Sequence, residues 1–372
     1  MKRGNELWVI SDIHVAHSWD EINKIIKGKI RFLNPNKELK RFIRIANKDN
    51  KLAGIVINGD AVDYFFQKLD ISRKRRASNW TLLYSILKDL KKPFFEVPGN
   101  HDYRREPYNY AIYGLKHVNI SSWIRRKFAD QIGHNNFRWL KEWSSVGVNE
   151  RLFNPFKKYK GIRYPKEKKI GKFKCLFLDS GSDANIRARD WLKCLEEFFY
   201  GKRLVIELDG PKERDVNFLA KSLGDKKRED IYVFMHAPII SPFKNRINKK
   251  YQLSLTNFLA SAARQRIDHE TIINNRERIL DIFRRSNKNI IFIASHIHEA
   301  KYFLIDKDSL EARQVSLKEI NKNLKNPRYI KHITTWALGE IPIERKLRKK
   351  KKTGFLKITS KGIKEIVTND FT

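Results

Sequence analysis

Side chains that bind metals recur in this chain directly after short apolar runs. The candidates are Asp12, His14, Asp60, Asn100, His236, His296 and His298. One polar residue after an apolar run is ordinary, but five runs that end in this way are hard to explain by packing alone. Carboxylate, amide and imidazole donors without a thiolate suit Mn²⁺, iron, Zn²⁺, Ni²⁺ or Co²⁺, and they argue against a structural zinc site.

The number of these candidates indicates how many metal ions they hold. Seven ligands exceed what one transition metal takes, whereas they suit two ions that share one carboxylate. Two ions about 3.5–4 Å apart can hold a hydroxide nucleophile and clamp a phosphate during in-line displacement. The donors therefore suit a site with two divalent transition-metal ions as cofactor, and Mn²⁺ is the metal we expect.

The first half of the chain alternates between patterns typical of strands and of helices. Residues 7–10, 53–57 and 93–97 are apolar runs that end in polar turns, and 36–48 and 79–92 repeat apolar residues at helical spacing. This alternation predicts a mainly parallel sheet. Ligands of such sheets lie beyond the carboxyl ends of the strands, which is where the candidate residues fall.

The second half continues the same alternation. We expect strands at 174–178, 231–235, 289–294, 330–336 and 354–358. We expect helices at 216–223 and 275–285. The strands at 231–235 and 289–294 are followed by His236 and by the pair His296 and His298, so the pattern of polar strand ends extends to this half.

Residues 103–172 interrupt the pattern with aromatic side chains mixed with Arg and Lys. We interpret them as an insertion or cap within a single domain that spans 1–372. The insertion is either a small helical subdomain with its own aromatic core or a wall of the substrate cleft, because aromatic and basic residues together can stack bases and bind phosphates. A second irregular segment, 345–352, consists almost entirely of Lys and Arg and predicts a solvated basic loop.

The chain is strongly basic. Its 372 residues include 78 Lys and Arg against 42 Asp and Glu, which gives a formal net charge of +36. Such a charge suits a polyanionic partner, nucleic acid above all, or it is spread over the surface without a partner. The composition leaves both interpretations open.

Cysteine content and hydropathy bear on the compartment. Two cysteines, Cys175 and Cys194, cannot form a disulfide framework, which fits a reducing environment. No secretory signal is visible, and no apolar stretch approaches the length of a membrane span. We expect a soluble protein of the cytoplasm, and the oligomeric state is left open.

Taken in chain order, these motifs resemble those of the calcineurin-like metallophosphoesterase superfamily. The resemblance rests on Asp12-Ile13-His14, Gly59-Asp60-Ala61-Val62-Asp63, Gly99-Asn100-His101-Asp102, His236 and His296-Ile297-His298. Five motifs in the order of the family are a specific match. The fold that the resemblance implies is an α/β (α+β) sandwich, with two mixed β-sheets flanked by helices.

The resemblance also implies two ligand sets, bridged by Asp60. To one metal ion it assigns Asp12, His14, Asp60 and His298. To the other it assigns Asp60, Asn100, His236 and His296. The motifs depart from the family pattern at Ser295, where Gly is usual, and we expect a local backbone adjustment there with ligation retained.

Catalytic roles follow from the same resemblance. His101 would protonate the leaving oxygen or stabilise charge on the phosphate, and Asp102 or Asp63 would orient it or a neighbouring ligand. His17, close to the first motif, is a candidate for contact with the substrate. Arg104, which with Arg105 follows the third motif, is either a donor to a phosphate oxygen or a solvated residue.

The implied activity is that of a dinuclear metal-dependent phosphoesterase, and we expect a phosphodiesterase in which a metal-bridging hydroxide attacks phosphorus. One alternative is a metal-dependent DNA or RNA nuclease, which the charge of +36 favours. Another is a small-molecule or lipid-headgroup phosphohydrolase with incidental charge. A non-catalytic metal-bearing scaffold fits less well, because the ligand set is complete and is accompanied by His101.

Overall fold

The structure is a computed structural model. It describes residues 4–17, 20, 34–63, 78–103, 165–181, 210–225, 227–240, 272, 275–339 and 353–367. The predicted basic loop at 345–352, Arg104, Arg105 and residues 104–164 of the predicted insertion lie outside this part of the chain. In the helices that are described, none is long and apolar enough to cross a membrane.

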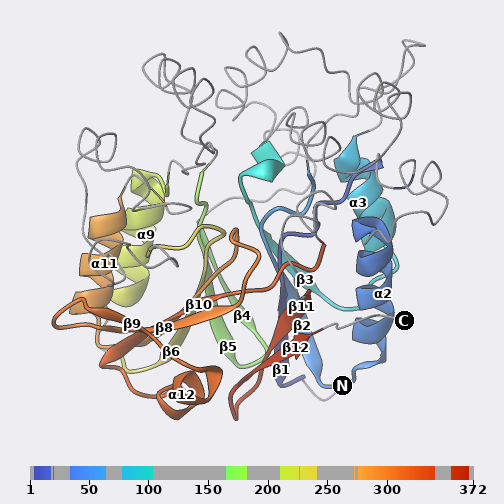
Figure 1. The fold of residues 1–372 in the computed structure, drawn as a ribbon. Helices are drawn as coiled ribbons and strands as arrows, with labels where there is room; N and C mark the ends of the chain where they lie inside the picture. Colours follow the sequence, from blue (N-terminus) through green and yellow to red (C-terminus); the bar gives the residue numbers. More distant parts are fainter. Residues whose placement is uncertain are drawn as a thin grey trace, which may run out of the picture.

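Two mixed β-sheets form the centre of the molecule (Figure 1). The smaller sheet has the strand order β12-β11-β1-β2-β3. Its strands are β1 (Glu6–Ile10), β2 (Leu52–Asn58), β3 (Phe94–Val97), β11 (Gly354–Ile358) and β12 (Ile363–Val367). β1, β2 and β3 run parallel, and β11 and β12 add antiparallel at one edge.

The larger sheet has the strand order β4-β5-β6-β7-β10-β8-β9. Its strands are β4 (Lys166–Ile170), β5 (Phe173–Phe177), β6 (Asp230–Phe234), β7 (Asn289–Ala294), β8 (Lys301–Asp306), β9 (Ala312–Gln314) and β10 (Tyr329–Thr334). β5, β6, β7 and β10 run parallel in its middle. β4, β8 and β9 pair antiparallel at its two sides.

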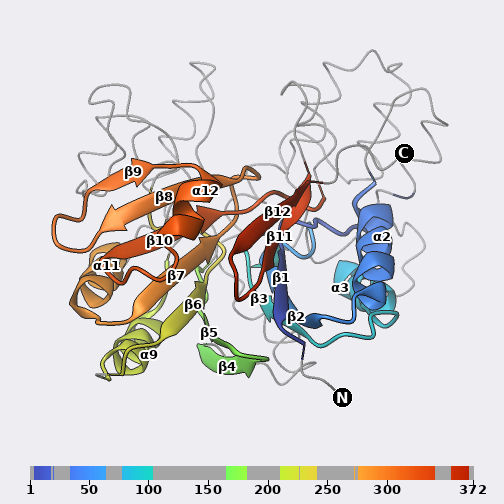
Figure 2. The ribbon, with the colours of Figure 1, turned by 90° about the horizontal axis from the view of Figure 1, so that it is seen from below.

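Helices cover the outer faces of both sheets (Figure 2). Those beside the smaller sheet are α2 (Pro35–Lys48) and α3 (Asn79–Leu87), and those beside the larger sheet are α9 (Glu213–Leu223) and α11 (Arg276–Arg285). One apolar cluster fills the space between the sheets and under α2 and α3, and another lies between the larger sheet and its own helices. This is the predicted sandwich, and the fold class is confirmed.

Local sequence explains where the helices of the smaller sheet begin and end. Asn34 caps α2 by accepting hydrogen bonds from the backbone amides of residues 36 and 37, and Pro35 occupies the first turn, where its missing N–H costs nothing. α3 ends at Leu87, whereas the apolar spacing predicted a helix to residue 92. The residue before Pro93 is disfavoured in helical conformation, which argues against a helix that reaches residue 92.

Several short strands were not predicted, and β4 is the informative one. It lies inside the range 103–172 interpreted as an insertion, yet it pairs with β5 along its whole length. The sequence of β4 is Lys-Glu-Lys-Lys-Ile, and only Ile170 is fully buried. A charged edge strand blunts unwanted pairing with other chains, but it carries no apolar signal. β4 therefore belongs to the larger sheet, and the extent of the insertion stays a prediction.

Candidate metal centre

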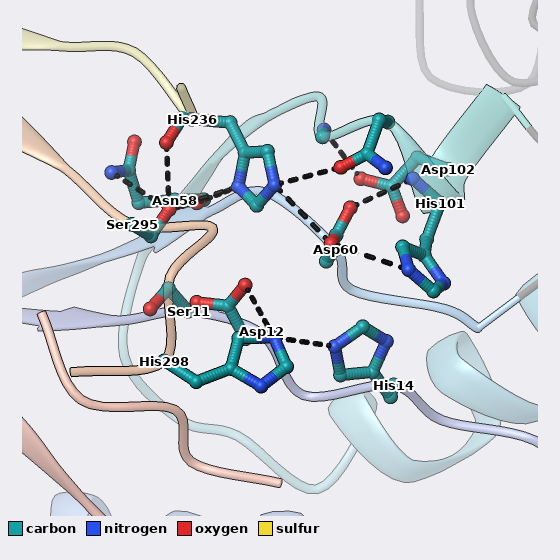
Figure 3. Close-up of polar contacts among 12 residues, drawn as sticks. Ser11, Asp12, His14, Asn58, Asp60, His101, Asp102, His236, Ser295 and His298 are labelled. Carbon is teal, nitrogen blue, oxygen red and sulfur yellow. Dashed lines mark hydrogen bonds and ion pairs between the residues drawn. The ribbon is translucent and has the colours of Figure 1, made fainter. Parts of the chain in front are cut away.

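The turns after β1 and β2, and those after β6 and β7, meet where the two sheets face one another (Figure 3). The amide of Asp12 donates to the carbonyl of Gly59 at 3.0 Å, which joins the first two turns. The amide of Ser295 donates to the carbonyl of His236 at 2.8 Å, which joins the other two. The carboxyl ends of strands from both sheets thus supply one site.

Two groups of side chains at this site have their ligand atoms within 4.8 Å of one another, and Asp60 belongs to both. One group is Asp12, His14, Asp60 and His298. The other is Asp60, His236 and His296. Every member is buried except His296, which is partly exposed. Six of the seven predicted ligands therefore lie in two groups that share a carboxylate.

The seventh predicted ligand, Asn100, reaches the second group through its side chain. Its Oδ1 atom lies 3.1 Å from Nε2 of His236. The same nitrogen lies 3.2 Å from Oδ2 of Asp60. The imidazole of His236 therefore points at an amide oxygen and a carboxylate at once, and the three atoms form a compact N/O donor set.

The first group has the same character. Nε2 of His298 lies 3.2 Å from Oδ1 of Asp12 and 3.2 Å from Nε2 of His14. Asp12 is fully buried, and within the described residues its Oδ2 atom accepts no hydrogen bond. A buried carboxylate oxygen without a donor is costly unless a cation neutralises it. These residues fit a divalent metal ion with N/O ligands.

Backbone conformation sets the candidate residues apart from the rest of the chain. Positive φ angles, uncommon outside glycine, occur in the described part of the chain at Asp12 (48°), His14 (54°), Asp60 (50°), His296 (72°) and His298 (58°), with Asn275 and Leu310 as the other non-glycine cases. Five of these seven residues are candidate ligands. Strained conformations of this kind concentrate at functional sites.

Two glycines allow the turns to approach so closely. A Cβ atom on Gly59, whose φ is 85°, would lie 2.2 Å from Nδ1 of His236. A Cβ atom on Gly99 would lie 2.3 Å from both the backbone nitrogen and Oδ1 of Asp60. Neither contact is sterically allowed, so these positions require glycine for the ligand side chains to keep their places.

Electrostatics show that the site demands positive charge. Burial raises the pKa of Asp12, but His298 beside it outweighs burial and lowers the pKa to about 2. Burial lowers the pKa of His236, but the nearby Asp60 outweighs it and raises the pKa to about 9. Burial likewise opposes ionisation of Asp60, whose pKa is nevertheless held well below its usual value, chiefly by His236. Carboxylates that hold histidines protonated would hold metal cations in their place.

His101, the predicted proton donor, is paired with Asp63. It lies in the short 3₁₀ helix η1 (His101–Tyr103). Its Nδ1 atom lies 2.9 Å from Oδ1 of Asp63, and its Nε2 atom lies 3.9 Å from Oδ2 of Asp60. Burial raises the pKa of Asp63, but His101 and His14 overcome this and depress it. Asp63 is therefore the charged carboxylate that orients the ring of His101.

Asp102, the other carboxylate considered for that role, supports the turns instead. It accepts hydrogen bonds from the backbone amides of Gly99 at 2.8 Å and Val62 at 3.1 Å. Burial and the nearby charge of Asp60 raise its pKa to about 8. Its contacts fix the loop that carries Asn100 and His101, so its effect on the chemistry is indirect.

The two predicted substrate contacts, His17 and Arg104, are not placed at the candidate ligands by the described part of the chain. His17 is half-buried beside α3, where its backbone amide donates to Oδ1 of Asn79 at 3.0 Å. Burial lowers the pKa of His17. None of its described contacts involves a candidate ligand. Arg104 lies outside the described residues.

Sequence reasoning missed Asn58, the last residue of β2. Its side-chain amide nitrogen lies 3.3 Å from the carbonyl oxygen of Met235 and 3.2 Å from that of Ile293, and it donates to both. It thereby ties the smaller sheet to the ends of β6 and β7. An asparagine that closes an apolar run was the available signal, because a buried amide requires partners.

A family model for calcineurin-like phosphoesterases matches residues 6–300, and the chain belongs to this family. It is a metal-dependent hydrolase of phosphoric esters, and the family implies two divalent metal ions. The match covers the five motifs and both donor groups. No curated relative matches the chain.

Solved structures similar to this chain include a dimetal phosphatase from Danio rerio, at 14% identity and a TM-score of 0.47, over 98% of this chain and 99% of the other. PhoD is similar at 9% identity and a TM-score of 0.43, over 95% of this chain and 64% of its own. A metallophosphoesterase from Sphaerobacter thermophilus has 12% identity and a TM-score of 0.33, over 98% and 88%. Similarity at this level carries no argument about the substrate.

Proposed function

We propose that this chain is a dinuclear phosphodiesterase. The observation that carries the proposal is that Asp60, itself buried, belongs to two donor groups at once. A carboxylate shared in this way is suited to bridge two metal ions, which is how two-metal sites clamp a phosphate. We place the enzyme in the cytoplasm, because the chain has two cysteines and no disulfide framework.

The ligand sets follow from the two groups. One ion is assigned to Asp12, His14, Asp60 and His298. The other is assigned to Asp60, Asn100, His236 and His296. Two divalent ions, Mn²⁺ being the pair we expect for these N/O donors, would supply a bridging hydroxide as nucleophile and neutralise charge on the phosphate.

The protein itself supplies the proton for the leaving group. Asp63 accepts from Nδ1 of His101, so the ring presents Nε2 on its opposite side, toward Asp60. From there Nε2 protonates the leaving oxygen, as a general acid held by a carboxylate does. Asp102 keeps the loop of His101 in place through its two backbone contacts. His17 and Arg104 remain proposed substrate contacts.

The substrate is proposed from charge alone. A formal charge of +36 favours a polyanion, so a nuclease is the leading specific form of this activity. A lipid-headgroup or small-molecule phosphohydrolase is the alternative. The nuclease predicts nucleic-acid affinity that falls steeply with salt, whereas the alternative predicts no binding above about 0.2 M salt.

A metal-by-substrate screen tests the proposal. Protein loaded with Mn²⁺, Zn²⁺, Ni²⁺ or Fe²⁺ is assayed against bis-(p-nitrophenyl) phosphate, p-nitrophenyl phosphate, and single- and double-stranded DNA and RNA. The His101→Asn protein should bind metal normally and turn over about 10²- to 10⁴-fold more slowly. The control His332→Phe, which replaces a buried histidine outside the site, should keep full activity. Unchanged turnover in His101→Asn contradicts the assigned role.

A further inference from the structure

The hydroxyl of Ser295 contacts a candidate metal ligand from behind (Figure 3). Ser295 follows β7 directly and is fully buried. Its Oγ atom lies 2.9 Å from Nδ1 of His236. The same oxygen lies 2.5 Å from the backbone carbonyl of Asn58 and 3.2 Å from that of His236. The departure from glycine at this position thus adds a hydroxyl beside the ring, beyond the backbone adjustment that was expected.

The direction of these hydrogen bonds follows from what each atom can do. The hydroxyl of Ser295 has one proton, and its shortest contact, 2.5 Å to the carbonyl of Asn58, identifies that carbonyl as the acceptor. Because the hydroxyl donates its proton to the carbonyl of Asn58, its oxygen is left to accept from Nδ1 of His236. The carbonyl of Asn58, 3.0 Å from Nδ1, also accepts only. Both neighbours of Nδ1 are therefore acceptors.

This arrangement selects one tautomer of His236. A nitrogen that faces two acceptors keeps its proton, so a neutral ring carries its lone pair on Nε2. Nε2 is the atom that faces Oδ2 of Asp60 and Oδ1 of Asn100. The lone pair is thus aimed into the second donor group, and the ring is held from behind as outer-shell partners hold metal-binding histidines.

The support behind Ser295 is rigid. Asn58 binds the carbonyls that end β6 and β7 through its side chain, so its own carbonyl is held between two strands. We propose that Ser295 is a positioning residue, which with the carbonyl of Asn58 fixes the tautomer and the orientation of His236 for the second metal ion. This inference rests on the proposed function, because it takes His236 as a ligand.

The test compares Ser295→Ala with wild type and with Ser295→Thr, which restores the hydroxyl. Ser286→Ala is the matched control, since Ser286 is also buried, precedes the opposite end of β7, and its hydroxyl bonds backbone groups of the described residues, at Leu223 and Lys288. Metal-free protein is titrated with Mn²⁺ and with Zn²⁺ by calorimetry. The Zn²⁺ form, labelled with ¹⁵N-histidine, is then examined by NMR, and His236→Asn identifies the His236 signals.

Wild type should bind two ions and show a protonated Nδ1 in His236. Ser295→Ala should bind the second ion about 10- to 100-fold more weakly and show faster exchange of the Nδ1 proton, while the first ion is unaffected. Ser286→Ala should lose stability without changing either readout. If Ser295→Thr folds, as judged by its thermal unfolding, it should recover the wild-type affinity.

Two outcomes overturn the inference, and they are distinguishable. If His236→Asn loses one ion but Ser295→Ala binds both ions with wild-type affinity and an unchanged Nδ1 signal, the positioning role of Ser295 is wrong and the proposed function stands. If His236→Asn binds both ions like wild type, the ligand assignment itself is wrong, and the inference fails with it.

Discussion

Strand β7 has buried ionisable groups beyond both of its ends, and the two ends satisfy them in opposite ways. Before its amino end, Lys288 donates to Oε1 of Glu229 at 2.8 Å and to the carbonyl of Lys227 at 3.0 Å. Lys307 donates to the carbonyls of Ser286 and Lys288 at 2.7 and 2.8 Å. At this end, buried ammonium groups are matched by acceptors from the protein itself.

Beyond the carboxyl end of β7, the matching is incomplete. Asp12 has a buried oxygen without a hydrogen-bond donor in the described residues. His14 and His298 face each other through Nε2 atoms 3.2 Å apart. His296 and His298 have positive φ angles, whereas the lysines of the other end do not. Buried charge alone is therefore no sign of function. Candidate ligands at positive φ beside a buried carboxylate oxygen without a donor are such a sign.

Removing Asp60, which lies in the donor groups beyond the carboxyl end of β7, should have the largest effect on activity and metal content, whereas a matched change at the amino end should have none. Asp60→Ala should lower phosphodiesterase activity by about 10³-fold or more, because the shared carboxylate holds both donor groups. Metal content, measured by mass spectrometry, should fall in parallel. Asp225→Ala removes a carboxylate that pairs with Lys288 at the other end and should leave both quantities unchanged. Full activity of Asp60→Ala at matched purity would contradict the two-metal mechanism.

A methyl group at Gly59 should cost both stability and metal binding. Gly59→Ala places Cβ against the His236 ring at positive φ, and we expect a loss of about 2–4 kcal/mol in the free energy of unfolding. Gly171→Ala, also at positive φ but in the β4–β5 turn, should lose stability without loss of metal affinity. Denaturant unfolding and calorimetric titration measure the two effects. Equal metal affinity in both variants would remove the steric argument.

Lys331, a buried lysine of β10, donates to Oδ1 of Asn289 at the amino end of β7 and tests the role of buried lysines at that end. Burial, and then Lys307, lower its pKa to about 7, so between pH 7 and its ordinary value of 10.5 the unfolded chain binds more protons than the folded one. Folding is thus penalised at pH 7, and the penalty disappears as the pH rises toward 10.5. Lys331→Met should raise the free energy of unfolding at pH 7 by about 1–3 kcal/mol, after loss of its two hydrogen bonds.

The gain should shrink when denaturant unfolding of Lys331→Met is repeated near pH 10. Lys288→Met is the contrasting variant, because it removes a buried ammonium group that pairs with Asp225 and Glu229, and it should destabilise the protein. Neither change should affect phosphodiesterase activity. A gain for Lys331→Met that does not depend on pH would show that packing, and not the proton, is responsible.

His332 supplies the smallest expected effect. It is fully buried, stacked on Phe292 with ring centroids 5.2 Å apart, and neither ring nitrogen has a hydrogen-bond partner in the described residues. His332→Phe should stabilise the fold by about 1–2 kcal/mol at pH 7. Burial lowers the pKa of His332 to about 3, so wild type should lose stability as the pH falls from 6.5 toward 3, and the advantage of the variant should grow. Denaturant unfolding at pH 7 and pH 5 measures this, and a constant difference would count against it.

The pattern of apolar runs was enough to predict the strands that carry the candidate ligands. β1, β2, β6 and β7 are short apolar runs, and a polar residue follows each of them. Parallel strands bring their carboxyl ends to one edge of a sheet, so the gathering of Asp12 and Asp60 follows from the pattern, whereas His236 joins them from the other sheet. β4 could not be found in this way, since its exposed face carries Lys and Glu.

The sequence by itself determined the donor chemistry, because residue type decides which atoms can bind a metal. It also determined that these donors follow strands. Only the tertiary structure decided that Asp63 contacts the ring of His101, since Asp63 precedes His101 by 38 residues in the chain, whereas Asp102 is its neighbour in sequence and contacts backbone amides instead. The hydroxyl of Ser295 meets the ring of His236 only because two turns from neighbouring strands pack together. Contacts of this kind depend on the relative placement of segments about 60 residues apart, which local pattern does not encode.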